Sequence, residues 1–253
     1  MSVPFVVSFG GGLNSIAMLL GLKARGLRPD LILFADTKSE FPETYELVVR
    51  ASNWCLENDF PAIETVFKTF RGQHEGLEAE CLRKKMLPGL AYGTRSCSIK
   101  HKGMVMDARL KRWAKATKTP LPILKAIGYD YGEPWRTQKT SPEPKIWTAW
   151  YPLAEWKWDR EKCHEVANAA GFKCVQKSAC FFCPASKKGE IIRMAETHQE
   201  LMARALAIEA TSETRNDRGL GGTFKWAEIL KGDRDQMRFD MEENPFVPCG
   251  CVE

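Results

Sequence analysis

Nine cysteines are the residues of this sequence whose chemistry most needs an explanation. Two of them, Cys180 and Cys183, form a CxxC pattern, the shortest common spacing at which two thiolates bind one metal ion. The same spacing occurs in redox pairs, in half of a zinc site, in half of an iron–sulfur site, and in two buried thiols that pair by chance. In a reducing compartment disulfides do not persist, so metal binding, catalysis or burial must account for the nine.

A second pattern with chemical potential lies near the amino terminus. Gly10, Gly11 and Gly12 follow an apolar run at 3–9 and precede a stretch of helical spacing that ends at Gly26. A glycine turn between a buried strand and a helix presents backbone N–H groups at the positive end of the helix, where a phosphate binds readily. The alternative is a simple tight turn. The pattern is neither GxGxxG nor GxxxxGK[ST], so the dinucleotide fingerprint and the Walker lysine are both absent.

The elements that must position these residues follow from the apolar pattern. A continuous apolar run at 30–36 and apolar-rich segments at 62–67 and 122–128 predict buried strands, and helical spacing at 42–58 and 98–117 separates them. Strands without polar alternation, joined by helices, are typical of a parallel sheet covered on both faces. We therefore expect an α/β, Rossmann-like fold with about five strands.

The organisation changes after about residue 130. Gly132 and Pro134, then Pro142 and Pro144, interrupt a segment rich in Trp and charge, which we interpret as a lid or insertion. Helical patterns return at 159–170 and 187–209, and a glycine-rich break follows at 219–222. We expect a nucleotide-binding α/β domain at 1–157 and a mostly helical extension at 158–253 packed on the same unit.

Composition narrows the class of protein. A chain of 253 residues and 28.6 kDa fits one α/β domain with a small appendage, and 44% hydrophobic with 27% charged residues excludes disorder, collagen and coiled coil. No apolar run approaches the roughly 18 residues that span a bilayer, and the amino terminus has no signal-peptide pattern. We expect a cytoplasmic protein without membrane contact. The net charge of +5 is compatible with a polyanionic partner but does not demand one.

Three segments resemble one known superfamily. SFGGGLNS at 8–15 resembles the PP-loop of N-type ATP pyrophosphatases and phosphoadenylyl-sulfate reductases, commonly SFSGGKDS. FADTKSEFPETYE at 34–46 is similar to the family's FxDTxxExPETYxFV segment, and YPLAEW at 151–156 to its YPLxxW segment. The matches occur in the family's order, and the resemblance implies a HUP-like fold that binds an adenine nucleotide at the carboxyl ends of the strands.

The resemblance also implies a nucleotide site and shows where this chain departs from the family. Gly10 replaces the usual Ser, Leu13 the usual Lys and Asn14 the usual Asp, which leaves the backbone cradle but removes side chains that would orient a triphosphate or its Mg²⁺. The resemblance therefore supports binding of ATP or another adenine nucleotide, with or without Mg²⁺, better than it supports cleavage of ATP. The implied nucleotide-binding residues are Ser8, Gly10, Gly11, Gly12, Asn14, Ser15, Asp36, Glu40, Lys100, Lys102 and Arg136.

Several of these assignments have an ordinary structural alternative. Ser15 is either a phosphate ligand or only a helix N-cap. The family's G-[IV]-R-x-x-E turn here reads GYDYGEPWR at 128–136, without the family's arginine, so Arg136 is taken as its substitute unless it is a solvated charge. Lys100 and Lys102, close after Cys97, are either anion ligands or part of a solvated helix face.

The metal site follows from the same resemblance. Adenylyl-sulfate reductases carry a Cys-Cys pair roughly 80 residues before a CxxC, and the four thiolates bind a 4Fe–4S cluster. Cys97 precedes Cys180 by 83 residues (180 − 97), with Ser96 at the first Cys position, so three ligands carry over. We expect Cys163 as the fourth ligand. A set of thiolates without a nearby His pair favours iron–sulfur, with a four-thiolate zinc site as the alternative.

The remaining cysteines have other expected roles. Cys81 and Cys174 are reserve ligands, and Cys55 is a packed core thiol. Cys249 and Cys251, in the carboxyl-terminal tail, resemble the mobile nucleophile of sulfonucleotide reductases, although the Glu that usually precedes it is absent. A metal-ligand pair or an incidental exposed pair is the stronger alternative.

Together these features predict an adenine-nucleotide enzyme of the phosphoadenylyl-sulfate reductase family with an iron–sulfur cluster. The combination of a PP-loop with a four-cysteine iron–sulfur site is similar to that of the DNA phosphorothioation ATP pyrophosphatase. The preferred activity is ATP-dependent adenylation with pyrophosphate release, coupled to sulfur transfer or nucleic-acid modification. Its partners would be a tRNA or DNA acceptor and a sulfur donor or thioredoxin-like reductant. The alternatives are reduction of a sulfonucleotide through Cys249 or Cys251, and a nucleotide sensor without catalysis.

Overall fold

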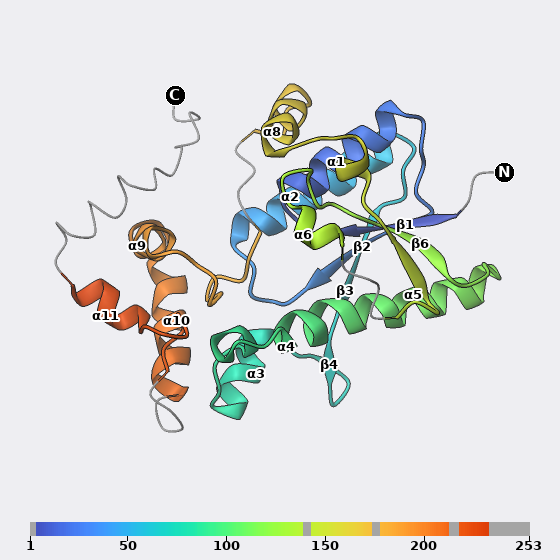
Figure 1. Cartoon of the computed structure of the whole chain (residues 1–253). Helices are drawn as coiled ribbons and strands as arrows, with labels where there is room; N and C mark the ends of the chain where they lie inside the picture. Colours follow the sequence, from blue (N-terminus) through green and yellow to red (C-terminus); the bar gives the residue numbers. More distant parts are fainter. Residues whose placement is uncertain (1–3, 139–142, 174–177, 213–217, 233–253) are drawn as a thin grey trace.

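A five-stranded, all-parallel sheet forms the centre of the computed structural model, which describes residues 4–138, 143–173, 178–212 and 218–232 (Figure 1). The strand order is β3-β2-β1-β6-β7. The strands are β1 (Phe5–Phe9), β2 (Leu31–Asp36), β3 (Ile63–Phe67), β6 (Ile123–Ile127) and β7 (Trp147–Trp150), and a separate hairpin joins β4 (Thr69–Phe70) to β5 (Gln73–His74). The predicted α/β class, the parallel sheet and the strand number are confirmed.

The fifth strand is the one that the sequence pattern did not reveal. β7 pairs in parallel with β6, although it lies in the segment interpreted as a lid or insertion. That interpretation is wrong for residues 147–150. Four residues between prolines and glycines form no recognisable apolar run, and only the pairing with β6 makes them a strand.

Helices cover the sheet on both faces because the strand residues alternate. Val7 and Phe9 face α1 (Leu13–Ala24), α2 (Pro42–Glu57) and α8 (Arg160–Ala169). Val6 faces the opposite side, where it packs in a cluster with Met106 and Leu110 of α5 (Met104–Thr117). This arrangement buries β1 on both sides, as its continuous apolar sequence predicts.

The strand order creates a switch point between β1 and β6. The chain leaves β1 through α1 on one face, whereas it enters β6 from α5 on the other face. In open α/β sheets the crevice at the carboxyl ends of two such strands is where ligands bind. Here those ends are Gly10 and Gly128.

A second hydrophobic cluster lies beside the sheet, around the CxxC turn. Phe181 and Phe182, which are almost fully buried, pack with Trp226 in this cluster. The helices around them are α3 (Leu77–Lys84), η1 (Gly89–Tyr92), α9 (Lys188–Thr197), α10 (Gln199–Ser212) and α11 (Trp226–Lys231). The buried carboxylate of Glu209 accepts hydrogen bonds from the N–H groups of Leu220, Trp226 and Ala227, which fixes the start of α11.

Packing crosses residue 157 in both directions. α8 follows that residue, yet Cys163 and Ala167 pack into the core over α1. α3 precedes it, yet Leu77 and Cys81 pack with α10. The short elements are α4 (Ser96–Ser98), the π-helical turn η2 (Ile99–Gly103), α6 (Pro134–Thr137) and α7 (Pro152–Glu155). Among the helices that the structure describes, none has the length and apolarity needed to cross a bilayer.

Candidate functional site

The glycine turn between β1 and α1 has no side chains at Gly10, Gly11 and Gly12, and Ser178 lies beside it, because a Cβ added to Gly12 would lie 3.0 Å from Ser178 Oγ. Gly11 has φ +73°, and a Cβ added there would lie 2.9 Å from Thr44 Cγ2 and 3.1 Å from Phe34 Cε2. Gly12 is the N-cap of α1 and has no side chain to occupy the first N–H groups of the helix. These N–H groups and the helix dipole are therefore left for an anion.

Ser15 shapes this turn from within the helix. Its buried hydroxyl oxygen accepts a hydrogen bond of 2.8 Å from Gly10 N–H, so its own proton stays available for an acceptor. Ser8, by contrast, is turned away from the glycines: its hydroxyl donates to Met106 Sδ at 3.3 Å, on the α5 face. Of the two predicted serines, Ser15 is the one at the turn.

Asn14 and Asp130 join the two sides of the switch point. Asn14 Nδ2 donates to Asp130 Oδ2 at 2.9 Å, and Asp130 Oδ1 accepts from Gly132 N–H at 2.9 Å. The backbones are also close, because a Cβ added to Gly128 would lie 3.0 Å from the Asn14 carbonyl oxygen. The sequence analysis did not select Asp130 as a site residue. Its position just after β6, between Gly128 and Gly132, could have indicated an acidic side chain at the carboxyl end of that strand.

Asn14 Oδ1 is buried and has no hydrogen-bond partner among the described residues. A buried polar atom in this state is costly unless a ligand or water satisfies it. Asp130 thus holds the Asn14 amide at the crevice through Nδ2, and Asn14 Oδ1 remains able to accept a hydrogen bond. This is the one unsatisfied side-chain acceptor of the glycine turn in the part of the chain that the structure describes.

Arg136 lies on the loop after β6 and is held there locally. Its Nη1 bonds both carboxylate oxygens of Glu133, at 2.8 and 3.1 Å, and its Cζ lies 4.2 Å from the ring centroid of Tyr129. Tyr129 stacks in turn on Tyr151, with 5.6 Å between ring centroids. The guanidinium is therefore fixed beside the switch point rather than free in solvent.

The end of β2 carries the predicted carboxylate Asp36. Its Oδ1 accepts hydrogen bonds from Lys38 N–H at 2.7 Å and from the Tyr45 hydroxyl at 2.9 Å. Burial, helped by the charge of Asp36, raises the pKa of Tyr45 well above its ordinary value. Tyr45 thus remains a protonated donor that fixes the Asp36 carboxylate.

Glu40 is a fully buried carboxylate that meets Lys102. Its Oε1 accepts from Lys102 Nζ at 2.8 Å and from Thr37 Oγ1 at 3.2 Å, while Oε2 is buried without a partner among the described residues. Burial lowers the pKa of Lys102, but the charge of Glu40 and the nearby thiols of Cys180 and Cys183 outweigh it, so the pKa is raised. Lys102 therefore stays a cation beside the CxxC turn.

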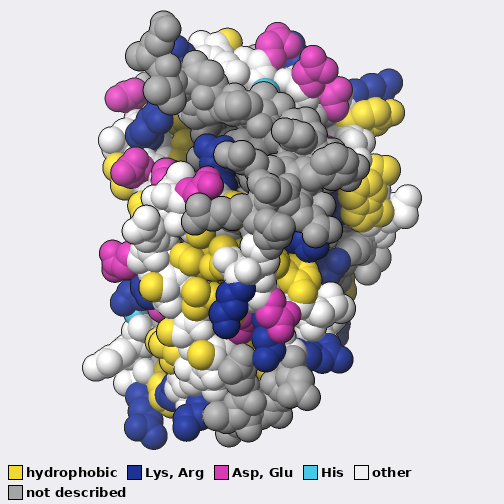
Figure 2. All heavy atoms as spheres, turned by 90° about the vertical axis from the view of Figure 1, so that its left-hand side faces the viewer, with side chains coloured by type: hydrophobic (Ala, Val, Ile, Leu, Met, Phe, Trp, Pro, Cys, Tyr) yellow, Lys and Arg dark blue, Asp and Glu magenta, His cyan; other side chains and the backbone are white. Residues whose placement is uncertain are grey.

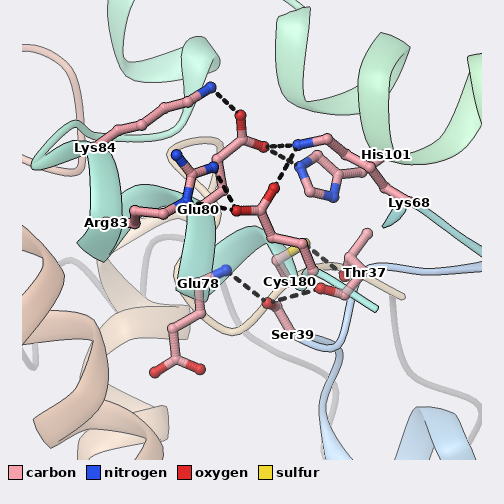
Figure 3. A network of polar contacts seen from close by, with 10 residues as sticks. Thr37, Ser39, Lys68, Glu78, Glu80, Arg83, Lys84, His101 and Cys180 are labelled. Carbon is pink, nitrogen blue, oxygen red and sulfur yellow. Dashed lines mark hydrogen bonds and ion pairs between the residues drawn. The ribbon is translucent and has the colours of Figure 1, made fainter. Parts of the chain in front are cut away.

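The CxxC turn docks directly on this loop (Figure 3). Cys180 forms an isolated antiparallel bridge with Glu40, Phe181 N–H donates to the Ser39 carbonyl at 2.8 Å, and Cys180 Sγ lies 3.4 Å from Thr37 Oγ1. Burial raises the pKa of the Cys180 thiol above its ordinary value, with a smaller contribution from Glu40. The tertiary structure thus joins two motifs more than 130 residues apart.

The other cysteines divide between two cores. Cys97 packs against the same hydrophobic cluster as Cys180 and the buried Cys81. Burial, with smaller contributions from Glu80 and then Cys97, raises the pKa of Cys81 to about 12. Cys163 is fully buried in the other core, over α1, where burial raises its pKa to about 12. Cys55 is a buried core thiol of α2, as expected. Cys174, Cys249 and Cys251 lie outside the described residues.

The predicted ligand set is consequently not assembled as one site. Cys97 and Cys180 pack against the second hydrophobic cluster, and Cys183 N–H bonds the Cys180 carbonyl in the same turn, whereas Cys163 belongs to the core over α1. Within residues 4–138, 143–173, 178–212 and 218–232, no group of three or more His, Cys, Asp or Glu side chains is placed to hold a metal ion. The residues as placed do not form a closed four-thiolate site, and Cys81 is closer to the set than Cys163.

A polar network fixes the region that carries Cys81 and Cys97 (Figure 3). Glu80 accepts from Lys68 Nζ at 2.6 Å, from His101 Nε2 at 2.5 Å, and from Lys84. Burial alone would raise the pKa of Glu80, but these hydrogen bonds hold it well below its usual range. Burial lowers the pKa of His101 more than Glu80 raises it, so the buried ring is neutral near pH 7 and its Nε2–H donates.

A cavity of about 450 Å³ lies on the α2 side of the glycine turn, away from the β1–β6 crevice. Gly11 lies on its wall, and Ala179, Phe181 and Ser186 line it next to the CxxC turn. The wall also includes Phe41, Thr44, Leu47, Arg50, Ile191, Met194 and Trp226. The cavity therefore borders both predicted motifs. Lys100 is exposed on η2, outside its lining.

Comparisons with known proteins give matches among solved structures, where 23 chains are similar. No protein-family model matches the sequence, and no curated protein matches it. Among solved structures, the U34-tRNA thiolase NcsA from Methanococcus maripaludis with its [4Fe-4S] cluster is similar, with a TM-score of 0.45 and 16% sequence identity over 99% of this chain and 76% of that chain.

Proposed function

We propose that this chain is a PP-loop enzyme that binds an adenine nucleotide and uses ATP to adenylate an acceptor. The observation that carries the proposal is the geometry of the β1–β6 switch point. A glycine turn without a side-chain cap begins α1 there, and Asn14 and Asp130 link it to the loop after β6. An adenine nucleotide with its phosphates on Gly10–Gly12 lies at the position where such sheets bind ligands.

The residues around the turn have distinct roles in this proposal. The N–H groups at the start of α1 hold the phosphates, and the Ser15 proton donates to one phosphate oxygen. Asn14 Oδ1 accepts from the nucleotide or a bound water, which satisfies its buried lone pair. Arg136, held by Glu133 and Tyr129, supplies the cation that Leu13 no longer provides.

The reaction that this site would support is nucleotidyl transfer. An oxygen of the acceptor attacks the α-phosphorus, a new O–P bond forms, and the bond to the bridging oxygen breaks so that pyrophosphate leaves with the electron pair. A sulfur nucleophile then attacks the acceptor carbon, and AMP leaves with the electrons of the C–O bond. The charge that develops on the phosphates is stabilised by the fixed N–H groups of the turn.

The proximity of Cys180 to the Thr37–Glu40 loop supports sulfur chemistry next to the nucleotide. Lys102 carries a positive charge beside Cys180 and Cys183. At Cys180 this charge offsets only part of the effect of burial and Glu40, which keep the pKa of the thiol above its ordinary value. No step is assigned to an iron–sulfur cluster, because the predicted ligands do not form a closed site among the described residues.

Two measurements on the full chain test the proposal. Equilibrium binding of ATP should weaken by roughly tenfold in Ser15→Ala, because the variant loses the Gly10 contact and the phosphate donor. Ser52→Ala is the matched control, because Ser52 also accepts a backbone hydrogen bond, from Ile63 N–H at 3.0 Å, but lies on α2. Pyrophosphate release from ATP should then appear when nucleic-acid acceptors are added.

The contrary results are distinct. Equal ATP affinity in Ser15→Ala and in the wild-type chain would remove the phosphate assignment. ATP binding without pyrophosphate release from any acceptor would favour a nucleotide sensor. Release of sulfite from a sulfonucleotide would favour the reductase alternative.

A further inference from the structure

The net charge of the chain is concentrated in one segment. Residues 68–104 contain eight Lys and Arg against three Glu, a net +5, whereas the remaining residues contain 29 Lys and Arg against 29 Asp and Glu. The whole excess of +5 therefore comes from this segment. It comprises the β4–β5 hairpin, α3, η1, α4 and η2, which lie together at the foot of the molecule in Figure 1.

These elements are also in contact with one another. Arg83 of α3 lies with its Cζ 4.1 Å from the ring centroid of Phe70 on the hairpin, and Lys68 bonds Glu80 of α3 at 2.6 Å. The turn after α3 meets α4, because a Cβ added to Gly89 would collide with the Ser96 hydroxyl. The elements that carry this charge are therefore packed together. Figure 2 shows Lys and Arg side chains at the lower edge of the face that it displays.

Four of these cations are exposed and have no carboxylate partner among the described residues: Arg71, Lys85, Arg95 and Lys100. Their neighbours Lys68, Arg83 and Lys84, by contrast, are paired with Glu75 and Glu80. We call the four exposed cations together with Phe70 the basic face. Its charge is not consumed within the described protein and is available to an anionic partner.

The basic face also carries exposed apolar side chains. Of the eleven large hydrophobic residues that are exposed among the described residues, five fall in this segment: Phe70, Leu82, Met86, Ile99 and Met104. Phe70 is 39% exposed, and the guanidinium groups of Arg71 and Arg83 lie 5.3 and 4.1 Å from its ring. Exposed aromatic rings beside arginine are the means by which proteins stack unpaired bases while cations hold the phosphates.

We infer that the basic face is a docking surface for a single-stranded segment of nucleic acid, RNA or DNA. Phosphates would contact Arg71, Lys85, Arg95 and Lys100, and an unstacked base would pack on Phe70. Arg95 and Lys100 flank the turn that holds Cys97, so a docked strand would lie next to the cysteine region. This inference deepens the proposed function by naming the class of its acceptor, and docking itself requires no ATP chemistry.

Fluorescence anisotropy of labelled single-stranded RNA and DNA oligonucleotides, without ATP, tests the inference on the full chain. The triple variant Arg71→Gln, Lys85→Gln, Arg95→Gln should bind at least tenfold more weakly at 0.1 M salt, and its log–log salt slope should fall by about 2. Phe70→Ala should weaken binding roughly tenfold with an unchanged slope. The matched control is Lys111→Gln, Arg112→Gln, Lys115→Gln, which removes equal charge from exposed positions of α5.

The results separate the possibilities. Tight binding of RNA, DNA or both with the expected variant effects supports the inference, and the preferred oligonucleotide identifies the sugar. Equal weakening in the α5 control would overturn it, because the effect would then be one of net charge. Binding of phosphatidylserine vesicles without oligonucleotide binding would also overturn it. ATP affinity, measured in parallel, should stay unchanged in the triple variant, so failure here is distinguishable from failure of the proposed nucleotide site.

Discussion

Asn14 Nδ2 donates a hydrogen bond of 2.9 Å to Asp130 Oδ2 and thereby ties the first turn of α1 to the loop after β6. PP-loop sequences usually have Asp where this chain has Asn14, and here the acid comes from the other side of the crevice. One carboxylate in this position is compatible with bound phosphates, and two facing carboxylates would repel each other. The side-chain carboxylate next to Asn14 is therefore supplied by Asp130, from the loop after β6.

This pairing predicts the effect of placing an aspartate at position 14. Asn14→Asp should lower the free energy of unfolding by about 1–3 kcal/mol, because it replaces a hydrogen bond with the repulsion of two partly buried carboxylates. The double variant Asn14→Asp, Asp130→Asn should recover most of the lost stability, because it exchanges the amide and the carboxylate between the two positions. Urea unfolding of the two single variants and the double variant gives the coupling energy. A coupling near zero would show that the two side chains act independently.

Gly11 should tolerate no side chain. Gly11→Ala combines a positive φ with a Cβ only 2.9 Å from Thr44, so it should cost about 2–4 kcal/mol of stability and abolish ATP binding. Gly26→Ala is the matched control, because Gly26 also has positive φ, +65°, but no atom lies within 4 Å of the added Cβ. Thermal unfolding of both variants checks the difference. Equal losses would mean that only the backbone conformation matters.

His101 should make stability depend on pH below neutrality. Its folded-state pKa is lowered, first by burial, so as the pH falls below about 6.5 the unfolded chain takes up a proton that the folded chain does not. Stability from this group is full above that pH and is lost as the pH falls, by about 1.4 kcal/mol for each unit of the shift. Urea unfolding at pH 7.5 and 5.5 should show a smaller difference in His101→Gln. An unchanged difference would assign the dependence to other groups.

The grouping of the cysteines predicts which of them affect metal content. After anaerobic reconstitution with iron and sulfide, Cys81→Ser should retain less iron than Cys163→Ser. The reason is that Cys81 packs in the same hydrophobic cluster as Cys97 and Cys180, whereas Cys163 packs in the core over α1. Cys55→Ser, in the same core as Cys163, is the control for general destabilisation. Iron and acid-labile sulfide per chain are the readouts. Loss of iron in Cys163→Ser alone would restore Cys163 as the fourth ligand.

The sequence determined the parts of this protein that depend on local pattern. Strands such as Leu31–Asp36 are long uninterrupted apolar runs, and the glycine turn combines residues that only a strand-to-helix turn requires. β7 escaped detection because four residues carry too little periodicity, and only pairing with β6 defines them. The CxxC spacing could be recognised in the sequence, but the residues that contact it in space, Thr37 and Glu40, could not.

Only the tertiary structure decided which distant side chains meet. The docking of Cys180 on Glu40, the hydrogen bond from Asn14 to Asp130, and the separation of Cys163 from Cys97 all join or divide segments far apart in the chain. Burial of a whole helix face set these relationships: α8 packs on α1 through Cys163 and Ala167, so the thiol is committed to that core whatever its distance from Cys180 along the sequence. Spacing along a chain names possible partners, and packing selects among them.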